Sequence, residues 1–231
     1  MSGPYFILAV VDGPSEALAT SVYQERSCDG ALIRILAYAC TAYADEIRKY
    51  VYVQHWRSPI PASHLRGGKA LVGYAEKANR WIRQARVVGH YMMVLFLVDN
   101  DRFTDTPSRQ QQLVNGIQAA LNAEEPTHRP IVVEGVAIEM IESWLLADPA
   151  LLAPSHELPR GKRSDEFWGN EKDSDSHHPK CLLRQHVCKP RNWCYAECIQ
   201  HWDIAAATKN SPSLRIFVDK ILVAATSLGL R

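Results

Sequence analysis

The chain of 231 residues has almost no net charge, because 26 Lys and Arg residues stand against 25 Asp and Glu residues for a formal charge of +1. A chain so balanced has no overall field to draw it to nucleic acid or to an anionic membrane, so such a contact would need a local patch. No internal repeat or low-complexity tract is visible. The length suits one α/β domain with an appendage better than two small domains.

Long hydrophobic runs are also missing. The apolar run at 5–11 has no basic segment before it and ends at Asp12, so it predicts neither a secretion signal nor a membrane span. We therefore expect a cytoplasmic protein with no membrane partner. In that reducing compartment the six cysteines are expected to be thiols or metal ligands rather than disulfides.

Apolar segments of strand length alternate with segments of helical periodicity. The expected strands lie at 6–11, 50–53, 92–98 and 131–133, and the expected helices begin near Glu16 and lie at 31–44, 71–85 and 109–123. This alternation predicts an α/β fold with a mostly parallel sheet flanked by helices.

The last third of the chain has a different composition. Residues 154–180 are polar and rich in Pro, Gly and Ser, which indicates a long loop or an insertion. The chain then resumes as helices, the last at about 213–228. We therefore expect an α/β domain at 1–153, a polar loop or insertion at 154–180 and a Cys-rich helical extension at 181–231 that packs on the first domain.

Carboxylates follow two of the expected strands. Asp99 and Asp101 come after the clearest apolar run, and Asp12 and Glu16 come after the first. The carboxyl ends of parallel strands open the binding crevice of such folds, and oxygen ligands suit Mg²⁺ or Mn²⁺. The alternative for Asp99 and Asp101 is an acidic turn that caps the next helix.

A further acidic pair lies in an apolar segment at 136–148. If that segment is one helix, Glu139 and Glu142 share a face and apolar side chains cover most of the rest. A buried carboxylate is costly unless a cation or a strong donor meets it. We therefore expect metal binding or, as the alternative, an internal ion pair with Lys or Arg.

Several motifs in fixed order support a comparison. They are Val11-Asp12-Gly13-Pro14-Ser15-Glu16, Arg66-Gly67-Gly68 with Tyr74, Leu97-Val98-Asp99-Asn100-Asp101, the 138–148 segment and Pro179-Lys180. In this order they resemble Toprim-like proteins of prokaryotic genome-defence loci, which are related to the overcoming-lysogenisation-defect nucleases. The resemblance implies a Toprim-like parallel sheet and an acidic Mg²⁺ site that acts on phosphodiester bonds or only holds a phosphate-bearing partner.

The resemblance also implies roles for single residues. Asp99 and Asp101 match its paired aspartates, and Glu139 would complete the acidic cluster. Asp12 stands where the Toprim pattern has Glu as metal ligand and general acid or base, so its reach is one methylene shorter. Glu16 matches a second acid, and Lys180 would contact phosphate, with a solvated surface Lys as the alternative.

Two other patterns bear on phosphate chemistry. Arg66, Gly67, Gly68 and Lys69 precede an expected helix and could bind phosphate through backbone N–H groups and charge, or form an ordinary Gly-rich turn. The Asp99 and Asp101 pair also resembles that of haloacid-dehalogenase-like phosphatases, but Phe103 stands where that family has Thr.

The segment after 176 concentrates soft ligands and basic residues. Cys181, Cys188, Cys194 and Cys198 could bind Zn²⁺, although their spacings lack the paired short knuckle of zinc fingers, and the alternative is buried or reduced thiols. Basic residues mix here with Trp193 and Tyr195 and could form a nucleic-acid patch or a solvated surface; they are Lys162, Arg163, Lys180, Arg184, Lys189 and Arg191.

The leading hypothesis is a Mg²⁺-dependent Toprim-type nuclease that acts on DNA or RNA, with a place in antiviral defence against phage. Its metal ligands would be Asp12, Glu16, Asp99, Asp101, Glu139 and Glu142. The rival is a catalytically weak Toprim-like binding subunit that works with a partner ATPase or another defence protein. A third reading is a zinc-organised interaction module in the C-terminal third.

Overall fold

The computed structural model describes residues 6–11, 18–20, 27–55, 74–99, 109–122, 130–137, 141–152 and 178–231. Its centre is a four-stranded sheet in the order β4-β1-β5-β6. The strands are β1 (Ile7–Val11), β4 (Val51–His55), β5 (Met93–Asp99) and β6 (Ile131–Ala137), and all neighbours pair in parallel. The expected α/β fold with a parallel sheet flanked by helices is therefore confirmed, together with a helical C-terminal region.

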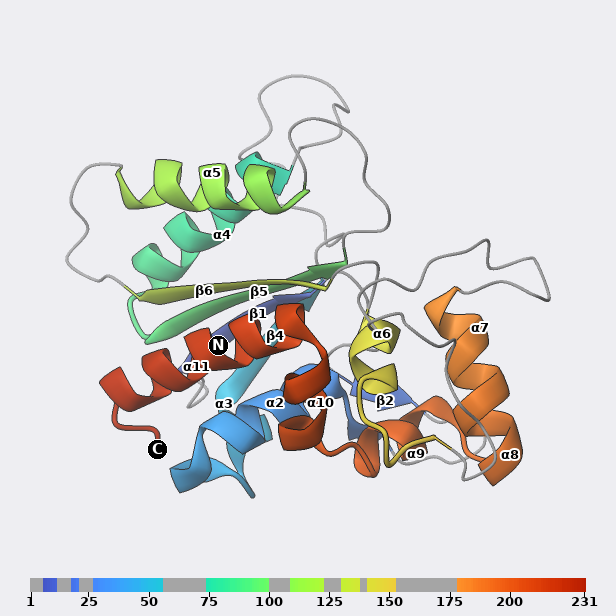
Figure 1. Ribbon diagram of the computed structural model, residues 1–231. Helices are drawn as coiled ribbons and strands as arrows, with labels where there is room; N and C mark the ends of the chain where they lie inside the picture. Colours follow the sequence, from blue (N-terminus) through green and yellow to red (C-terminus); the bar gives the residue numbers. More distant parts are fainter. Residues whose placement is uncertain are drawn as a thin grey trace.

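Helices cover both faces of this sheet. The helices within the described ranges are α2 (Ala31–Ala39), α3 (Ile47–Tyr50), α4 (Tyr74–Val88), α5 (Arg109–Leu121), α6 (Ile141–Leu146), α7 (Pro179–Leu183), α8 (Lys189–Arg191), α9 (Tyr195–Gln200), α10 (Ile204–Asn210) and α11 (Pro212–Ser227). In Figure 1, α4 and α5 lie on one face and α2, α10 and α11 on the other. The helices α6 to α9 lie beyond the arrowheads of the strands. None of the helices in the described ranges is long and apolar enough to cross a membrane.

The continuous apolar runs of the strands follow from this layering. Successive strand side chains point to opposite faces, so a strand covered on both sides must be apolar at every position. In β1, Ile7 and Ala9 enter the core under α2 and α11, whereas Leu8 and Val10 enter the core under α4 and α5. Burial of all five β1 residues is what the sequence pattern at 6–11 predicts.

Two segments differ from the expected helices. The helix expected at 31–44 ends at Ala39 and is followed by a short 3-10 turn at Thr41–Tyr43, because Cys40 leaves the helical backbone. The helix expected to begin near Glu16 is wrong at residues 18–20, where β2 (Leu18–Thr20) pairs antiparallel with β3 (Ser27–Asp29). This hairpin packs against α9, so a contact distant in sequence decides its conformation.

The C-terminal helices are part of the main core. Asp203 and Ser211 cap α10 and α11 through their side-chain oxygens, and Pro212 occupies the first helical position of α11. From α11, Phe217 and Ile221 are buried in the same core as Ile7 of β1. The helix α11 thus covers one face of the sheet over β6.

Close packing of α4 on α5 leads to a stability prediction. A Cβ atom at Gly116 of α5 would overlap the backbone of Ala75 in α4. In an unhindered helix, Gly→Ala adds about 0.5–1 kcal/mol of stability. We expect Gly116→Ala instead to lower the free energy of unfolding by about 1–3 kcal/mol, because two helix backbones must separate.

Urea denaturation of the full chain measures this effect. Gln118→Ala, at an exposed position of the same helix, is the control and should change stability little. A Gly116→Ala protein more stable than wild type would contradict the packing of α4 on α5.

Candidate functional site at the carboxyl edge of the sheet

The strand register brings the carboxyl ends of the four strands to one edge. Val11, the last residue of β1, pairs with both His55 of β4 and Leu97 of β5. Asp99, the last residue of β5, pairs with Ala137, the last residue of β6. The carboxyl ends of the four strands therefore lie within a few residues of one another along the strand direction.

The expected acidic residues follow these strand ends in the sequence. Asp12 comes directly after β1, Asp101 two residues after β5 and Glu139 two residues after β6. Asp99 is described through its backbone, as the end of β5. The other expected residues of this edge lie outside the described residues; they are Asp12, Glu16, Arg66, Gly67, Gly68, Lys69, Asp101 and Glu139.

The strand order creates a switch point between β1 and β5. From β1 the chain continues through α2 and α3 on one face to β4, whereas from β5 it continues through α5 on the opposite face to β6. Where two neighbouring strands send their connections to opposite faces, a crevice opens at their carboxyl ends. Val11 and Asp99 border that point.

The helix that follows β6 is firmly held by α11. Trp144 of α6 is fully buried, and its indole Nε1 donates to Ser213 Oγ at 2.8 Å. Its ring also stacks on Phe217, with centroids 5.6 Å apart. The apolar surroundings expected for this segment are confirmed, because every α6 residue except Glu142 is buried.

The end of α6 is fixed by polar contacts. Asp148 is fully buried, and its two carboxylate oxygens accept from the backbone N–H groups of Ala150 and Asp203, at 2.9 and 2.8 Å. Asn210 Nδ2 donates to the carbonyl of Ala147 at 3.0 Å. These contacts join α6 to both ends of α10, so the element that follows Glu139 has a single well-packed position.

The extent of this helix corrects the sequence prediction. A single helix over 136–148 is wrong, because Val136 and Ala137 belong to β6 and α6 begins at Ile141. The ladder with β5 extends the strand to Ala137. Glu142 lies in the first turn of α6 and is partly exposed, and it has interactions within the protein.

Lys180 lies in a helix instead of the expected polar loop. It is exposed in the first turn of α7, which begins with Pro179, a residue favoured at that position. Pro179 itself and Cys181 are buried. The helix α7 lies beyond α6 on the side of the strand arrowheads (Figure 1).

Two of the four cysteines expected as zinc ligands are neighbours. The sulfur atoms of Cys188 and Cys198 are 3.5 Å apart. Cys194 caps the N-terminus of α9, and Cys181 is buried in α7. Within the described part of the chain no three His, Cys, Asp or Glu side chains are grouped so that they could hold one metal ion, and zinc binding by the four cysteines stays a prediction.

The paired thiols differ in acidity. The hydrogen bond with Cys198 lowers the pKa of Cys188, and the charge of Arg184 adds to this effect. The same hydrogen bond, followed by burial, raises the pKa of Cys198. Burial raises the pKa of Cys40 to about 11. Of the two thiols, Cys188 therefore loses its proton more readily than Cys198.

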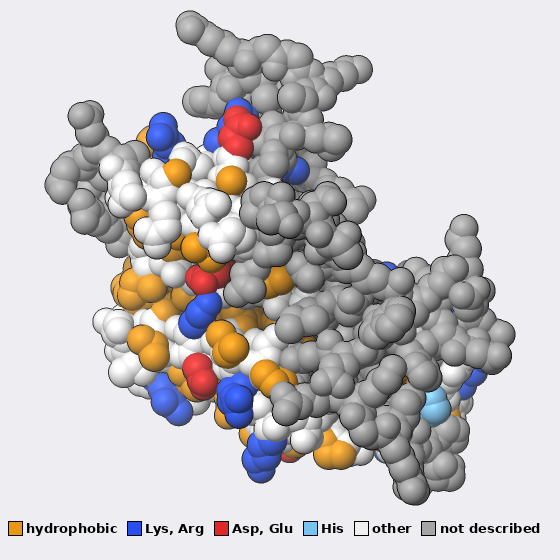
Figure 2. All heavy atoms as spheres, turned by 45° about the horizontal axis from the view of Figure 1, so that its top comes forward, with side chains coloured by type: hydrophobic (Ala, Val, Ile, Leu, Met, Phe, Trp, Pro, Cys, Tyr) orange, Lys and Arg blue, Asp and Glu red, His pale blue; other side chains and the backbone are white. Residues whose placement is uncertain are grey.

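Two residues of the expected nucleic-acid patch, Arg191 and Trp193, make contacts within the protein. Arg191 donates from Nε and Nη2 to the carbonyls of residues 150–152 at 2.8–3.1 Å, and its guanidinium lies 4.7 Å from the Trp193 ring centroid. Trp193 stacks on His201. Lys180, Arg184 and Lys189 remain exposed. On the face shown in Figure 2, the described charged side chains are scattered and form no patch of one sign.

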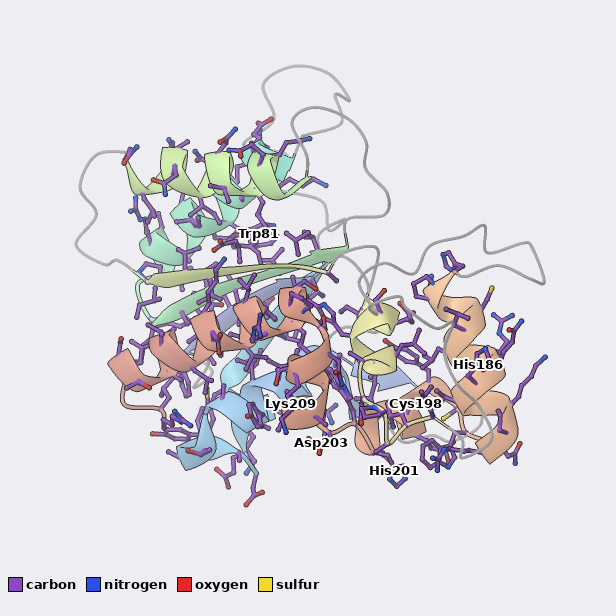
Figure 3. The ribbon with its side chains drawn as sticks, in the orientation of Figure 1. Trp81, His186, Cys198, His201, Asp203 and Lys209 are labelled. Atoms are coloured by element: carbon purple, nitrogen blue, oxygen red, sulfur yellow. The ribbon has the colours of Figure 1, made fainter. Side chains whose placement is uncertain are left out.

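Sequence reasoning missed the pairing of Cys188 with Cys198 and the role of Asp148. For the cysteine pair, the only signal in the sequence is a ten-residue spacing that includes Pro190 and Asn192. Asn192 takes the left-handed backbone conformation that reverses the chain. Figure 3 shows Cys198, His201 and Asp203 on neighbouring elements of this C-terminal region. Asp148 gave no signal beyond being an acid at the end of an apolar helix.

Comparison with known proteins identifies no relative. No protein-family model matches the chain, and no curated protein and no solved structure matches it either. The resemblance to Toprim-like proteins therefore stays a prediction.

The capping box of α9 generates a pH prediction. Glu197 Oε2 accepts from the backbone N–H of Cys194 at 2.6 Å, and the Glu197 N–H donates to the Cys194 side chain. Hydrogen bonding of the Glu197 carboxylate to Cys194, first with its backbone and then with its side chain, lowers the pKa of Glu197 below its ordinary 4.5. The ionised form is therefore the one that the folded state favours.

We expect Glu197→Gln to be less stable than wild type near neutral pH. A carboxyl group whose pKa is lowered by folding stabilises the protein above its unfolded pKa, and this contribution disappears as the pH falls through the folded value. The difference between the two proteins should therefore shrink below pH 4.5. Thermal melts across this range test it, and a difference that does not depend on pH would contradict the charged cap.

Proposed function

We propose that the protein is a divalent-metal-dependent phosphodiesterase that cleaves DNA or RNA at the carboxyl edge of its sheet. The observation that carries the proposal is the register that ends β1 at Val11 and β5 at Asp99 beside a switch point. Acidic residues follow at three of the strand ends, which is the ligand chemistry that Mg²⁺ and Mn²⁺ prefer. The resemblance to Toprim-like nucleases supports the same chemistry.

The residues of this edge would have separate roles. Asp99 and Asp101 would bind the metal together with Glu139, and Glu142 would assist from the first turn of α6. Bound there, Mg²⁺ would supply Lewis-acid stabilisation to a phosphate group. Asp12 or Glu16 would bind metal as well and hold or release the proton of the attacking water. Lys180 and the Arg66–Lys69 segment would contact phosphate.

The rival proposal keeps the fold but not the chemistry. In it the same edge holds a phosphate-bearing partner in a defence complex, because the short side chain of Asp12 does not reach the position of a general base. Both proposals predict divalent-metal binding at the edge, and only the first predicts strand cleavage.

We expect Asp99→Asn to abolish metal-dependent cleavage of single-stranded and double-stranded DNA and RNA. The substitution keeps the shape of the side chain but removes a charged ligand. Since Lewis-acid stabilisation is worth several kcal/mol, the rate should fall about a hundredfold or more. Cleavage is measured with Mg²⁺ and with Mn²⁺ on the full-length protein.

Asp219→Asn provides the matched control, because Asp219 is an exposed carboxylate on α11 at the face of the sheet rather than at its edge. It should cleave like wild type. Equal activity of the Asp99→Asn and wild-type proteins would contradict the catalytic proposal. Mn²⁺ binding that Asp99→Asn weakens, without any cleavage by wild type, would favour the binding protein instead.

A further inference from the structure

The thiols of Cys188 and Cys198 meet between two elements that are not part of the sheet edge. Cys188 ends the π-helical turn Arg184–Cys188, which follows α7 directly. Cys198 lies in α9 and has no exposed surface, whereas Cys188 is partly exposed. Their sulfur atoms, 3.5 Å apart, are already in contact. A disulfide bond requires a separation of about 2.05 Å, so a shift of roughly 1.5 Å would join them.

The backbone around the pair keeps the two cysteines together. The N–H of Trp193 donates to the carbonyl of Cys188 at 2.9 Å, which returns the chain to Cys188 just before α9 begins. Arg191 ties the turn between them to the carbonyls of residues 150–152. The sulfur contact is thus held by hydrogen bonds on the segment that joins the two residues.

The two cysteines are not equivalent as targets. π-helical turns are rare overall, and those that occur are frequently found at functional sites. Here the turn ends at the partly exposed Cys188, whereas Cys198 is fully buried. An oxidant from solvent therefore meets the partly exposed residue Cys188 before the buried Cys198. The buried sulfur lies next to it and is protected from direct oxidation.

We propose that Cys188 and Cys198 form a reversible oxidation site at which a hydroperoxide converts the two thiols into a disulfide. The sulfur of Cys188 attacks the O–O bond, forms an S–O bond and becomes a sulfenic acid, while the other oxygen leaves as an alcohol or water with the thiol proton. The Cys198 sulfur then attacks the Cys188 sulfur. The S–O bond breaks, the S–S bond forms and the Cys198 proton leaves in water. Two thiols lose two electrons, and the hydroperoxide gains them.

This inference is independent of the proposed nuclease activity. It uses none of the carboxylates at the sheet edge, and its readout is a covalent bond. Cys40 provides an internal comparison, because it is fully buried and makes no contact like that of Cys188 with Cys198 among the described cysteine side chains. It should not react with hydroperoxide in the folded protein.

The test is treatment of the reduced full-length protein with hydrogen peroxide, followed by alkylation, tryptic digestion and mass spectrometry. Trypsin cleaves after Arg184, Arg191 and Lys209 but not between Lys189 and Pro190. Cys188 and Cys198 therefore fall in different peptides, 185–191 and 192–209. We expect these two peptides to be linked, with the loss of two hydrogen atoms and full reversal by dithiothreitol.

Three variants assign the bond. Cys194→Ser should keep the link, because Cys194 is the other cysteine of peptide 192–209. Cys198→Ser should lose it and leave Cys188 as a sulfenic acid that a dimedone probe labels. Cys188→Ser, at the more exposed position, should lose the link without disturbing the core, and circular dichroism checks that each variant is folded.

Two results would overturn the proposal. One is a link that persists in Cys198→Ser and disappears in Cys194→Ser, which would assign the bond to Cys194. The other is wild-type protein that shows no link although the same peroxide treatment oxidises a dithiol peptide mixed with it. Oxidation of Cys188 to sulfinic acid without a link to Cys198 would likewise overturn the proposal.

Discussion

Parallel pairing of β1 with β4 and β5, and of β5 with β6, is the constraint on which the rest of this structure depends. A parallel sheet cannot be closed by short turns, so each strand must be followed by a crossover that covers one face. Covering both faces makes every residue of β1 apolar and buried. Parallel pairing also places the carboxyl ends of the four strands at one edge of the sheet.

The C-terminal helices complete this arrangement from a distance in sequence. The helix α11 covers β6 and carries Ser213 and Phe217, which hold Trp144 of α6. Glu134 of β6 and Lys220 of α11 form an ion pair. Since α6 follows β6 directly, the position of the segment after the sheet edge depends on residues near the end of the chain. Loss of α11 would therefore expose the sheet and release α6 together.

Most of the sheet could be predicted from the sequence, because burial on both faces leaves an apolar run that needs no partner to be recognised. The strand at 92–98 and the helix at 109–123 were expected within two residues of β5 and α5. Features that depend on distant partners could not be found this way. The β2 and β3 hairpin packs on α9, β6 continues to Ala137 through its ladder with β5, and Lys180 is helical because α7 packs against α6.

The acidic residues at the sheet edge and the pair of Cys188 and Cys198 differ in how far the sequence alone predicts them. Acids after strands can be read as a candidate site, since the geometry of a parallel sheet brings strand ends together whatever the side chains are. No comparable rule predicts from the sequence that the Cys188 and Cys198 side chains are in contact. Their contact needs a π-helical turn, the left-handed Asn192 and the hydrogen bond from Trp193 to Cys188, each of them a local departure from regular structure. Cys198 and Ile199 are fully buried in the main core, so the approach of the two sulfur atoms has to come from the turn that carries Cys188.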